Sequence, residues 1–496
     1  MATNTGNPGT ITFDEIFAKL ENSRLTINHY KLITAAVLGD MLEFFDYFII
    51  GFVLQFIVVP WKLTFGQTAI VLLSAGVGSL LGSFYFGWLA DRMGRLKVCI
   101  ITIFAFSVPA GLMYFTPNGN WVFLTVLRFV VGFGVGGLYS VDLPLVQEFV
   151  PTRHRGVIGG IVTALIPAGT LLAAMSAGYL TPFFRNNAAS WGMTQLAAEP
   201  WRGLFLIGLI PAALALMFRF WMRESPRYLI SRGRHADAVK SINWILHENY
   251  DPQKVVLGPG AGTPKAAPKF SEIFKYPRSV GVTWMVSFIQ SIMDYGFVLW
   301  APTLLMLTLK IPPTQAAKMM IVVAFSSIVG KFFWAFLGEV VGRRIAGMLI
   351  GLGSIVTCLI VANFWSATLG GWPVIFLSFV AVYFFINGGW SITGPYSTEI
   401  WPQRLRGTGM GSAYGMGGIG RIFGPMILAL FAGQTNLVTP KATLGAIGPA
   451  WTFFAVCGAV MVVTYFFAQE TRNKTVVEIE QMLGVPEKEA AQAAGR

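Results

Sequence analysis

Residues 87–95 read Gly-Trp-Leu-Ala-Asp-Arg-Met-Gly-Arg, and a degenerate copy, Gly-Glu-Val-Val-Gly-Arg-Arg, stands at residues 338–344. Charged positions of the two stretches are 248 residues apart, and the same offset relates Asp46 to Asp294. A further set repeats at an offset of 251, as expected if one loop changed length: Glu148, Pro151, Arg155 and Gly156 match Glu399, Pro402, Arg406 and Gly407. Charged residues seldom match by accident in an apolar background, so the chain is a duplicated unit.

The composition indicates that this duplicated unit lies in a membrane. Of 496 residues, 54% are hydrophobic and only 12% are charged, and the mean hydropathy is +0.62. Apolar runs of about 20 residues, the length that spans a bilayer core, recur along almost the whole chain. We expect spans that begin near Leu32, Thr68, Val98, Trp121, Gly156, Gly203, Gly281, Ala316, Ala346, Trp372, Gly407 and Pro449. The prediction is an all-α membrane protein with twelve transmembrane helices in two pseudo-symmetric six-helix bundles.

One long polar interruption divides these spans evenly. The expected parts are an N-terminal segment at 1–31, a six-helix bundle at 32–221, a connector at 222–278, a second bundle at 279–468 and a tail at 469–496. Within the connector, residues 235–247 predict a short amphipathic helix, and residues 258–269, rich in Gly, Pro, Ala and Lys, predict a linker. The connector is too short and too poor in apolar residues to form a separate enzyme domain.

The net charge of +13 reflects membrane topology rather than nucleic-acid binding. Basic residues gather in alternate short loops: Arg92, Arg95 and Lys97; Arg153 and Arg155; Arg223, Arg227, Arg232 and Arg234; Arg343 and Arg344; Arg404 and Arg406. This pattern predicts that both termini are cytoplasmic. The first 31 residues lack the apolar core of a cleavable signal peptide. Cys99, Cys358 and Cys457 are too isolated for a disulfide framework or a metal site, so we expect packing roles and no cofactor.

Residues 87–95 closely resemble the loop motif of the major facilitator superfamily, and residues 338–344 stand where its second half repeats it. Three further features are similar to the sugar-porter branch: Arg128 with Gly132, Gly134 and Gly136; residues 224–229, Glu-Ser-Pro-Arg-Tyr-Leu; and the repeated Glu, Pro, Arg-Gly pattern. Residues 39–46 are similar to the first-span motif of aromatic-acid and other metabolite:proton symporters. The resemblance implies the major facilitator fold in a cell membrane.

Charged loop residues at the cytoplasmic helix ends are expected to act as gates. Their carboxylates and guanidinium groups can form charge-assisted hydrogen bonds between helices when the cytoplasmic side is closed, and these bonds would break on opening. The gating set is Asp91, Arg92, Gly94, Arg95, Glu148, Arg155, Glu339, Arg343, Glu399 and Arg406. The alternative is ordinary anchoring and topology signalling.

Asp40, Glu43 and Asp46 of the first span lie within an arc of about 120° at helical pitch. Each charge at membrane depth costs roughly 2.5 to 3.5 kcal/mol on insertion scales, so three carboxylates together indicate a proton-binding cluster. No histidine lies inside a predicted span, so proton coupling would rest on carboxylates. Resemblance to sugar-porter-type symporters implies Asp46 as the proton acceptor, Arg128 as its alternating partner and Glu43 as a relay or a substrate contact. The alternative is a permanent buried ion pair between Asp46 and Arg128.

Arg421 lies near the middle of the eleventh span and requires a partner. Asp294 can supply one permanently, or a substrate carboxylate can pair with the guanidinium. A basic residue on this span tends to accompany anionic substrates in related organic-ion carriers, which favours the substrate. Lys331 is a weaker candidate because its long stem can snorkel toward the interface. Carboxylate, amide and aromatic groups complete the predicted substrate site: Asp142, Gln290, Asp294, Tyr295, Tyr139, Asn387 and Trp390.

The leading hypothesis is therefore a proton-coupled symporter of a small organic acid, such as an aromatic or heterocyclic monocarboxylate, that works as a monomer in the bilayer. Three other transport activities stay open: uptake of an organic cation, uptake of a sugar or polyol, and proton-driven export of drugs. A membrane sensor signalling through residues 222–278 ranks lower, since that segment is short for an output domain. No phosphate-binding loop, metal-spaced His or Cys set or nucleophile elbow indicates an enzyme.

Overall fold

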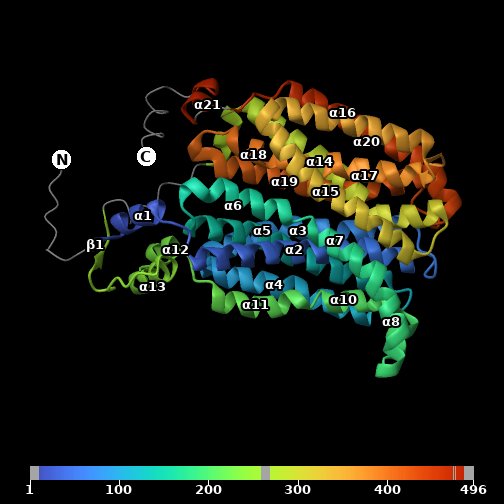
Figure 1. Cartoon of the computed structure of the whole chain (residues 1–496), viewed down its shortest axis with the longest axis horizontal. Coiled ribbons are helices and arrows are strands. Elements are labelled where there is room, and N and C mark those ends of the chain that lie inside the picture. Colours follow the sequence, from blue (N-terminus) through green and yellow to red (C-terminus); the bar gives the residue numbers. More distant parts are fainter. Residues whose placement is uncertain (1–10, 259–268, 473, 475, 485–496) are drawn as a thin grey trace.

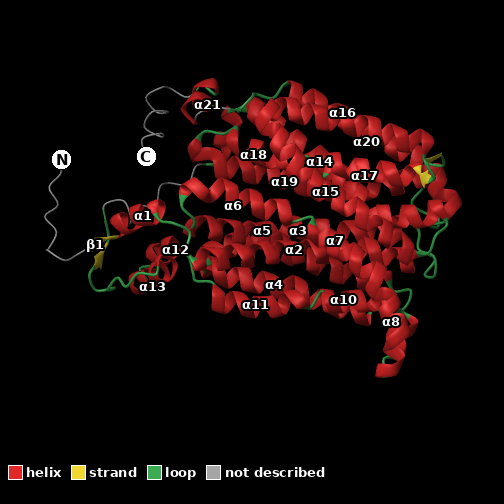
Figure 2. Cartoon of the chain, in the orientation of Figure 1, coloured by secondary structure: helices red, strands yellow, loops and turns green. Residues whose placement is uncertain are grey.

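The computed structural model describes residues 11–258, 269–472, 474 and 476–484. It is almost entirely helical, and its long helices lie side by side with their axes aligned (Figures 1 and 2). Ten helices of the described chain are long and apolar enough to cross a membrane. Two further passes fall short of this criterion, because α2 carries three carboxylates in its middle and the pass of α10 and α11 is broken into short pieces. The passes form two bundles of six, as predicted.

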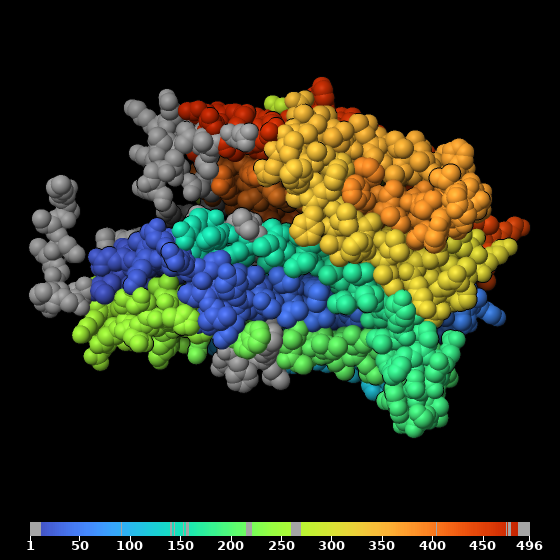
Figure 3. All heavy atoms as spheres, viewed as in Figure 1, coloured from blue at the N-terminus to red at the C-terminus, as the bar shows by residue number. Residues whose placement is uncertain are grey.

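The first bundle occupies one half of the molecule (blue to green in Figure 3). Its passes are α2 (Ile27–Ile57), α3 (Phe65–Met93), α4 (Arg95–Leu112) with η1 (Met113–Phe115), α5 (Trp121–Phe149), α6 (Thr152–Leu165) with α7 (Ala168–Met175), η2 (Ser176–Leu180) and α8 (Thr181–Asn187), and α10 (Gly203–Ile207) with α11 (Ile210–Trp221). The short elements between α8 and α10 are η3 (Ala188–Trp191), α9 (Thr194–Ala198) and η4 (Pro200–Arg202).

The second bundle occupies the other half (yellow to red). Its passes are α14 (Pro277–Leu309), α15 (Pro313–Val341), α16 (Arg343–Phe364), α17 (Val374–Ile386) with α18 (Trp390–Glu399), α19 (Arg406–Ala432) and α20 (Pro440–Phe466). A one-turn η6 (Gln403–Leu405) precedes α19, and β3 (Thr368–Leu369) pairs with β4 (Trp372–Pro373) between α16 and α17. The last pass begins at Pro440 rather than near Pro449, because Thr439 caps the helix and proline is tolerated in a first turn.

The connector forms a small layer at one end of the bundles, together with α1 (Phe13–Asn22), and we call this the connector end. Its elements are α12 (Pro226–Ser231), α13 (His235–Leu246), β2 (Val255–Val256) and η5 (Phe270–Lys275), while α21 (Val476–Met482) lies at the same end. The predicted amphipathic helix is thus present as α13. Apolar side chains of α1, α12 and α13 form a separate core, and β1 (Ile11–Thr12) pairs in parallel with β2. Residues 259–268 of the predicted linker lie outside the described residues.

Close helix contacts within a bundle depend on small residues. A Cβ atom added at Gly82 of α3 would lie 1.9 Å from the carbonyl oxygen of Phe133 on α5. Without such small residues the two backbones could not approach so closely, and in lipid this packing replaces the hydrophobic force between helices.

The two bundles meet most closely at the end opposite the connector. There the main-chain N–H of Phe65 donates to the carbonyl of Asn436 at 2.9 Å, and that of Val438 donates to Leu63 at 3.0 Å. At the connector end, Gly159, Gly160, Gly394 and Gly411 would each meet nothing within 4 Å of an added Cβ. Main-chain hydrogen bonds therefore join the two bundles at the far end, whereas these four glycines near the connector end face open space.

Candidate functional site

The three carboxylates of α2 are all buried, but they point to different neighbours. Asp46 is 0% exposed and faces the break between α10 and α11, where a Cβ added at Gly208 would lie 2.7 Å from its Oδ1. Neither carboxylate oxygen of Asp46 has a hydrogen-bond partner among the described residues. A buried carboxylate without a donor is costly in its charged form, and protonation relieves that cost. The environment of Asp46 therefore suits a group that binds a proton.

Arg128 of α5 reaches α2 through main-chain atoms. Its Nη1 and Nη2 donate to the carbonyl oxygens of Asp46 and Tyr47, each at 2.7 Å, and the guanidinium is 0% exposed. The sequence thus brings Arg128 and Asp46 together as expected, but the guanidinium bonds to the main chain rather than to the carboxylate.

Asp40 and Glu43, the other two carboxylates of α2, have neighbours of their own. The carboxyl of Asp40 lies within hydrogen-bonding reach of the carboxyl of Asp142 on α5, and both residues are 2% exposed. Oε2 of Glu43 is buried and has no hydrogen-bond partner within the described ranges. Asp142, predicted as a substrate contact, therefore joins the predicted proton-coupling residues.

Asp294 of α14 is held by the broken helix formed by α17 and α18. Its carboxylate accepts from Asn387 Nδ2 at 3.0 Å and from Trp390 Nε1 at 2.9 Å. The helix breaks at Asn387, so this side chain lies beside an interrupted main chain, an arrangement tolerated at membrane depth where it lines a protein interior. Gln290, one turn away, donates to the carbonyl of Ile386 at 3.0 Å and accepts from Thr393. Asp294, Asn387 and Trp390 therefore form one hydrogen-bonded network, and Gln290 is held next to it by the same broken helix.

Arg421 of α19 lies among tyrosine rings rather than carboxylates. Its guanidinium carbon is 4.3 Å from the ring centroid of Tyr414 and 5.4 Å from that of Tyr295. Arg421 is 7% exposed, and within the described chain it makes no ion pair and its Nε has no hydrogen-bond partner. Asp294 is bonded elsewhere, so it is not the permanent partner of Arg421.

Aromatic contacts join this site across the bundle interface. The rings of Tyr47 on α2 and Tyr295 on α14 are 5.3 Å apart and nearly perpendicular, and Phe48 lies 5.4 Å from Tyr295. The charge of Arg421 also acts on Glu43 from the opposite bundle. Arg421 therefore lies at the meeting point of the two halves, where each half supplies rings and polar groups.

The side chain of Lys331 on α15 does not extend to the membrane–water interface, contrary to the expectation from its long stem. It is 6% exposed, and its Nζ donates to the main-chain carbonyl of Thr163 on α6 at 2.8 Å. The fourth residue after Thr163 is Pro167, which has no N–H to bond this carbonyl. The lysine thus crosses from one bundle to the other to reach an acceptor that the helix leaves open.

The gating residues of the first bundle pair within that bundle. Arg95 Nη1 lies 2.7 Å from Glu148 Oε1, and Ser225 also donates to Glu148. Glu224 accepts from the main-chain N–H of Arg95 at 2.9 Å and so caps the start of α4. Gly94 stands at this corner with φ of +102°, a conformation that favours glycine.

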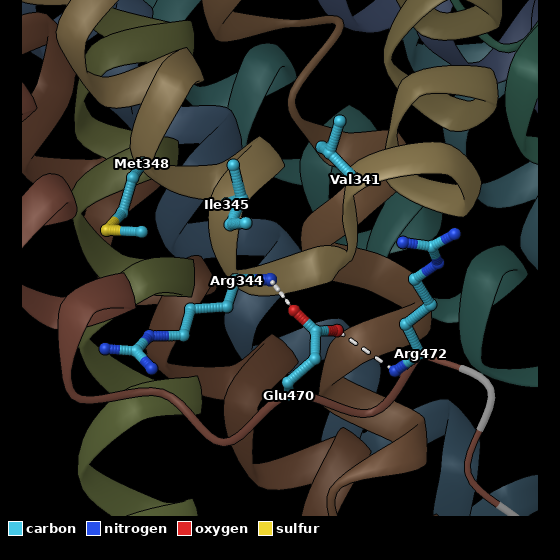
Figure 4. Close-up of a pocket in the computed structure, with 6 residues that line it drawn as sticks. All are labelled: Val341, Arg344, Ile345, Met348, Glu470 and Arg472. Carbon is cyan, nitrogen blue, oxygen red and sulfur yellow. Dashed lines mark hydrogen bonds between the residues drawn. The ribbon is translucent and has the colours of Figure 1, made fainter.

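The second bundle repeats this corner. Arg343 lies 2.6 Å from Glu339 and 3.5 Å from Glu399, and Thr471 donates to Glu399 at 2.7 Å. Glu470 takes the place of Glu224, because it accepts from the main-chain N–H groups of Arg344 at 3.1 Å and Arg472 at 3.0 Å (Figure 4). Glu470 and the two arginines line a surface hollow. Its lining residues are Val341, Arg344, Ile345, Met348, Glu470 and Arg472.

Sequence reasoning missed this second cap. Glu470-Thr471 repeats Glu224-Ser225 at an offset of 246 residues, which was a usable signal. Among the described side chains, Arg95 lies 2.7 Å from Glu148 and Arg343 lies 3.5 Å from Glu399.

The remaining predicted residues fall into two groups. The side chains of Asp91, Tyr139 and Arg155 lie outside the described part of the chain. Arg92 lies over the ring of Trp88 at 4.1 Å, and Nε of Arg406 has no hydrogen-bond partner in the described part. Arg92 also contacts the connector, because its main-chain carbonyl accepts from the hydroxyl of Tyr228 at 2.8 Å.

Comparison with known proteins identifies relatives over nearly the whole chain. Residues 31–483 match the profile of the family described as "Sugar (and other) transporter". The niacin transporter NiaP of Acinetobacter baylyi is 27% identical over 472 residues, which cover 94% of this chain and 99% of that protein. The cis,cis-muconate transport protein of the same organism is 23% identical and covers 90% and 96%. A putative niacin/nicotinamide transporter of Bacillus subtilis is 26% identical and covers 82% and 90%.

Solved structures with the same fold are more distant in sequence. A D-xylose-proton symporter superposes with a TM-score of 0.69 at 20% identity, covering 90% of this chain and 99% of that one. A bacterial homologue of the human lysosomal transporter Spinster, in an inward-facing conformation, has a TM-score of 0.68 at 17% identity and covers 88% and 96%. These likenesses establish the fold.

Proposed function

Because the chain belongs to the sugar (and other) transporter family, and is a membrane transporter of the major facilitator superfamily rather than an enzyme, we propose that it moves a small organic acid together with protons. The substrate class rests chiefly on one observation, the buried guanidinium of Arg421. This group makes no ion pair with a carboxylate of the described chain and faces tyrosine rings. A substrate that supplies both a carboxylate and a flat ring satisfies these two features.

The names of the relatives support this substrate class. Two are niacin transporters and one transports cis,cis-muconate, and all three names denote organic acids or their close derivatives. We therefore take niacin, a pyridine carboxylate, as the first probe for this chain.

Proton coupling is proposed from the carboxylates of α2. In our proposal Asp46 binds and releases the transported proton, and Arg128 exchanges its bond to the Asp46 carbonyl for one to the carboxylate. Glu43 relays between this group and Arg421, whose charge acts on it. Asp294, Gln290, Asn387, Trp390 and Tyr295 would line the substrate path from the second bundle, and the predicted contacts Tyr139 and Asp142 would do so from the first.

Alternating access is proposed from the two-bundle architecture. Main-chain hydrogen bonds join the bundles at the far end, and rocking one bundle against the other would break them and expose the central residues to each side in turn. We propose that the connector end, with both termini, is cytoplasmic and that a single chain forms the transport path in the cell membrane. The pairs Arg95–Glu148 and Arg343–Glu399 would brace each bundle during this motion.

Uptake into proteoliposomes tests the proposal. Purified protein should accumulate labelled niacin when the outside is acidic, and a protonophore should abolish the accumulation. Nicotinamide, which has the same ring without the charge, should compete poorly. Stabilisation of the protein only by amines or only by sugars in a thermal-shift screen would contradict the organic-acid assignment.

A further inference from the structure

Asp40 and Asp142 face each other from adjacent helices of the first bundle. Both are 2% exposed, and their carboxyls lie within hydrogen-bonding reach. Two ionised carboxylates in contact inside a protein repel each other strongly, so a stable pair holds one proton between them. This pair is separate from Asp46, whose carboxylate lies against Gly208 on another side of α2.

The surroundings of the pair include one unsatisfied acidic group and few cations. Oε2 of Glu43 is buried without a hydrogen-bond partner in the described chain. The titratable and charged groups that face the pair from neighbouring elements are Glu43 on α2, Cys99 on α4, Lys331 on α15, and Arg421 and Tyr414 on α19.

Lys331 lies between carboxylates of the two bundles. Its charge acts on Asp40 in the first bundle and on Asp294 in the second. Its hydrogen bond, however, goes to the neutral carbonyl of Thr163 at 2.8 Å, which Pro167 leaves without an N–H. Lys331 thus bonds a neutral carbonyl although two carboxylates lie within electrostatic range of it. This arrangement indicates that in this conformation these carboxylates do not need the lysine as a direct counter-ion.

We propose that Asp40 and Asp142 share one proton, and that Lys331 is the counter-charge that takes the place of this proton when it leaves. The proton departs to water, and Lys331 keeps its own protons. The ammonium then moves from Thr163 toward Asp40, so the hydrogen bond between α15 and α6 breaks and the contact between the bundles changes. This site rests on the proposed proton coupling and adds to it a residue from the second bundle.

Infrared spectroscopy of the purified wild-type protein tests the shared proton without a substrate. The carbonyl stretch of a protonated carboxyl should be present at neutral pH and should shift when aspartate carries a ¹³C-labelled carboxyl. Asp142→Asn and Asp40→Asn should each reduce this band, since the remaining aspartate can ionise beside Lys331. A band that does not respond to labelling, or that keeps its full size in both variants, would overturn the proposal.

Lys331→Gln distinguishes a counter-charge from a structural hydrogen bond. Without the ammonium, the band should persist to a pH higher by about one unit or more, the size of effect expected from a nearby charge. Lys318→Gln, an exposed lysine of the same helix, should leave it unchanged. Pro167→Ala restores an N–H that can bond the Thr163 carbonyl. If the only role of Lys331 is to bond this carbonyl, adding Pro167→Ala to Lys331→Gln should return the pH dependence of the band to that of the wild type. Such a reversal would refute the counter-charge role.

A transport measurement separates this inference from the proposed function. If wild-type protein shows no proton-driven accumulation of niacin but the infrared results hold, the proton site stands and the symport proposal fails. If accumulation is driven by protons but the band is unaffected by both aspartate variants, the proposed function stands and the shared-proton site fails.

Discussion

Replacing Arg421 by alanine tests the anion site most directly. The guanidinium is 7% exposed and has no carboxylate partner among the described residues, so its removal leaves no protein carboxylate unpaired. The expected cost therefore falls on the substrate. A hydrogen bond that involves a charged group contributes about 1.5 to 3 kcal/mol, which corresponds to a loss of binding of roughly 10- to 150-fold.

Equilibrium binding of niacin and nicotinamide to purified protein measures this effect. Niacin should bind Arg421→Ala with the loss stated above, whereas nicotinamide, which carries no carboxylate, should lose much less. Arg421→Lys should recover part of the affinity, because an ammonium keeps the charge but not the planar fork of donors. Arg185→Ala, at an exposed arginine of α8, serves as the control. Equal weakening of both ligands, or no weakening, would refute the role of Arg421.

Three further predictions follow from named contacts. Asp46→Asn should abolish proton-driven accumulation of niacin while exchange across the membrane stays detectable, and normal accumulation in vesicles would count against Asp46. Asn387→Ala removes a donor to buried Asp294 and should cost about 1 to 3 kcal/mol of stability, visible as a lower midpoint in thermal denaturation, with an unchanged midpoint as the contrary result. Gly342→Ala should destabilise by about 1 to 3 kcal/mol, because φ is +99° and the new Cβ would lie 2.4 Å from Glu470 Oε2; equal stability of wild type and variant would show that the corner relaxes freely.

The sequence by itself determined the architecture, because membrane insertion imposes strong rules on composition. Helices that span a bilayer must be apolar over a fixed length, and their charged residues collect in loops, so the twelve passes and the connector were predictable. The duplication was visible for the same reason: charged residues such as Asp46 and Asp294 stand out from an apolar background. Burial of Asp40, Glu43 and Asp46 was predictable from helical pitch.

Only the tertiary structure decided which buried groups meet. Helical pitch places Asp40 and Asp46 on one broad face, but helix packing turns Asp40 toward Asp142 and Asp46 toward Gly208. Asp294 accepts hydrogen bonds from residues 93 and 96 positions further along the chain, and Arg421 packs against tyrosine rings. Lys331 has its bond in the other bundle, at an acceptor freed by Pro167. Long-range pairing depends on how helices rotate and approach one another, and the local pattern of a sequence does not carry that information.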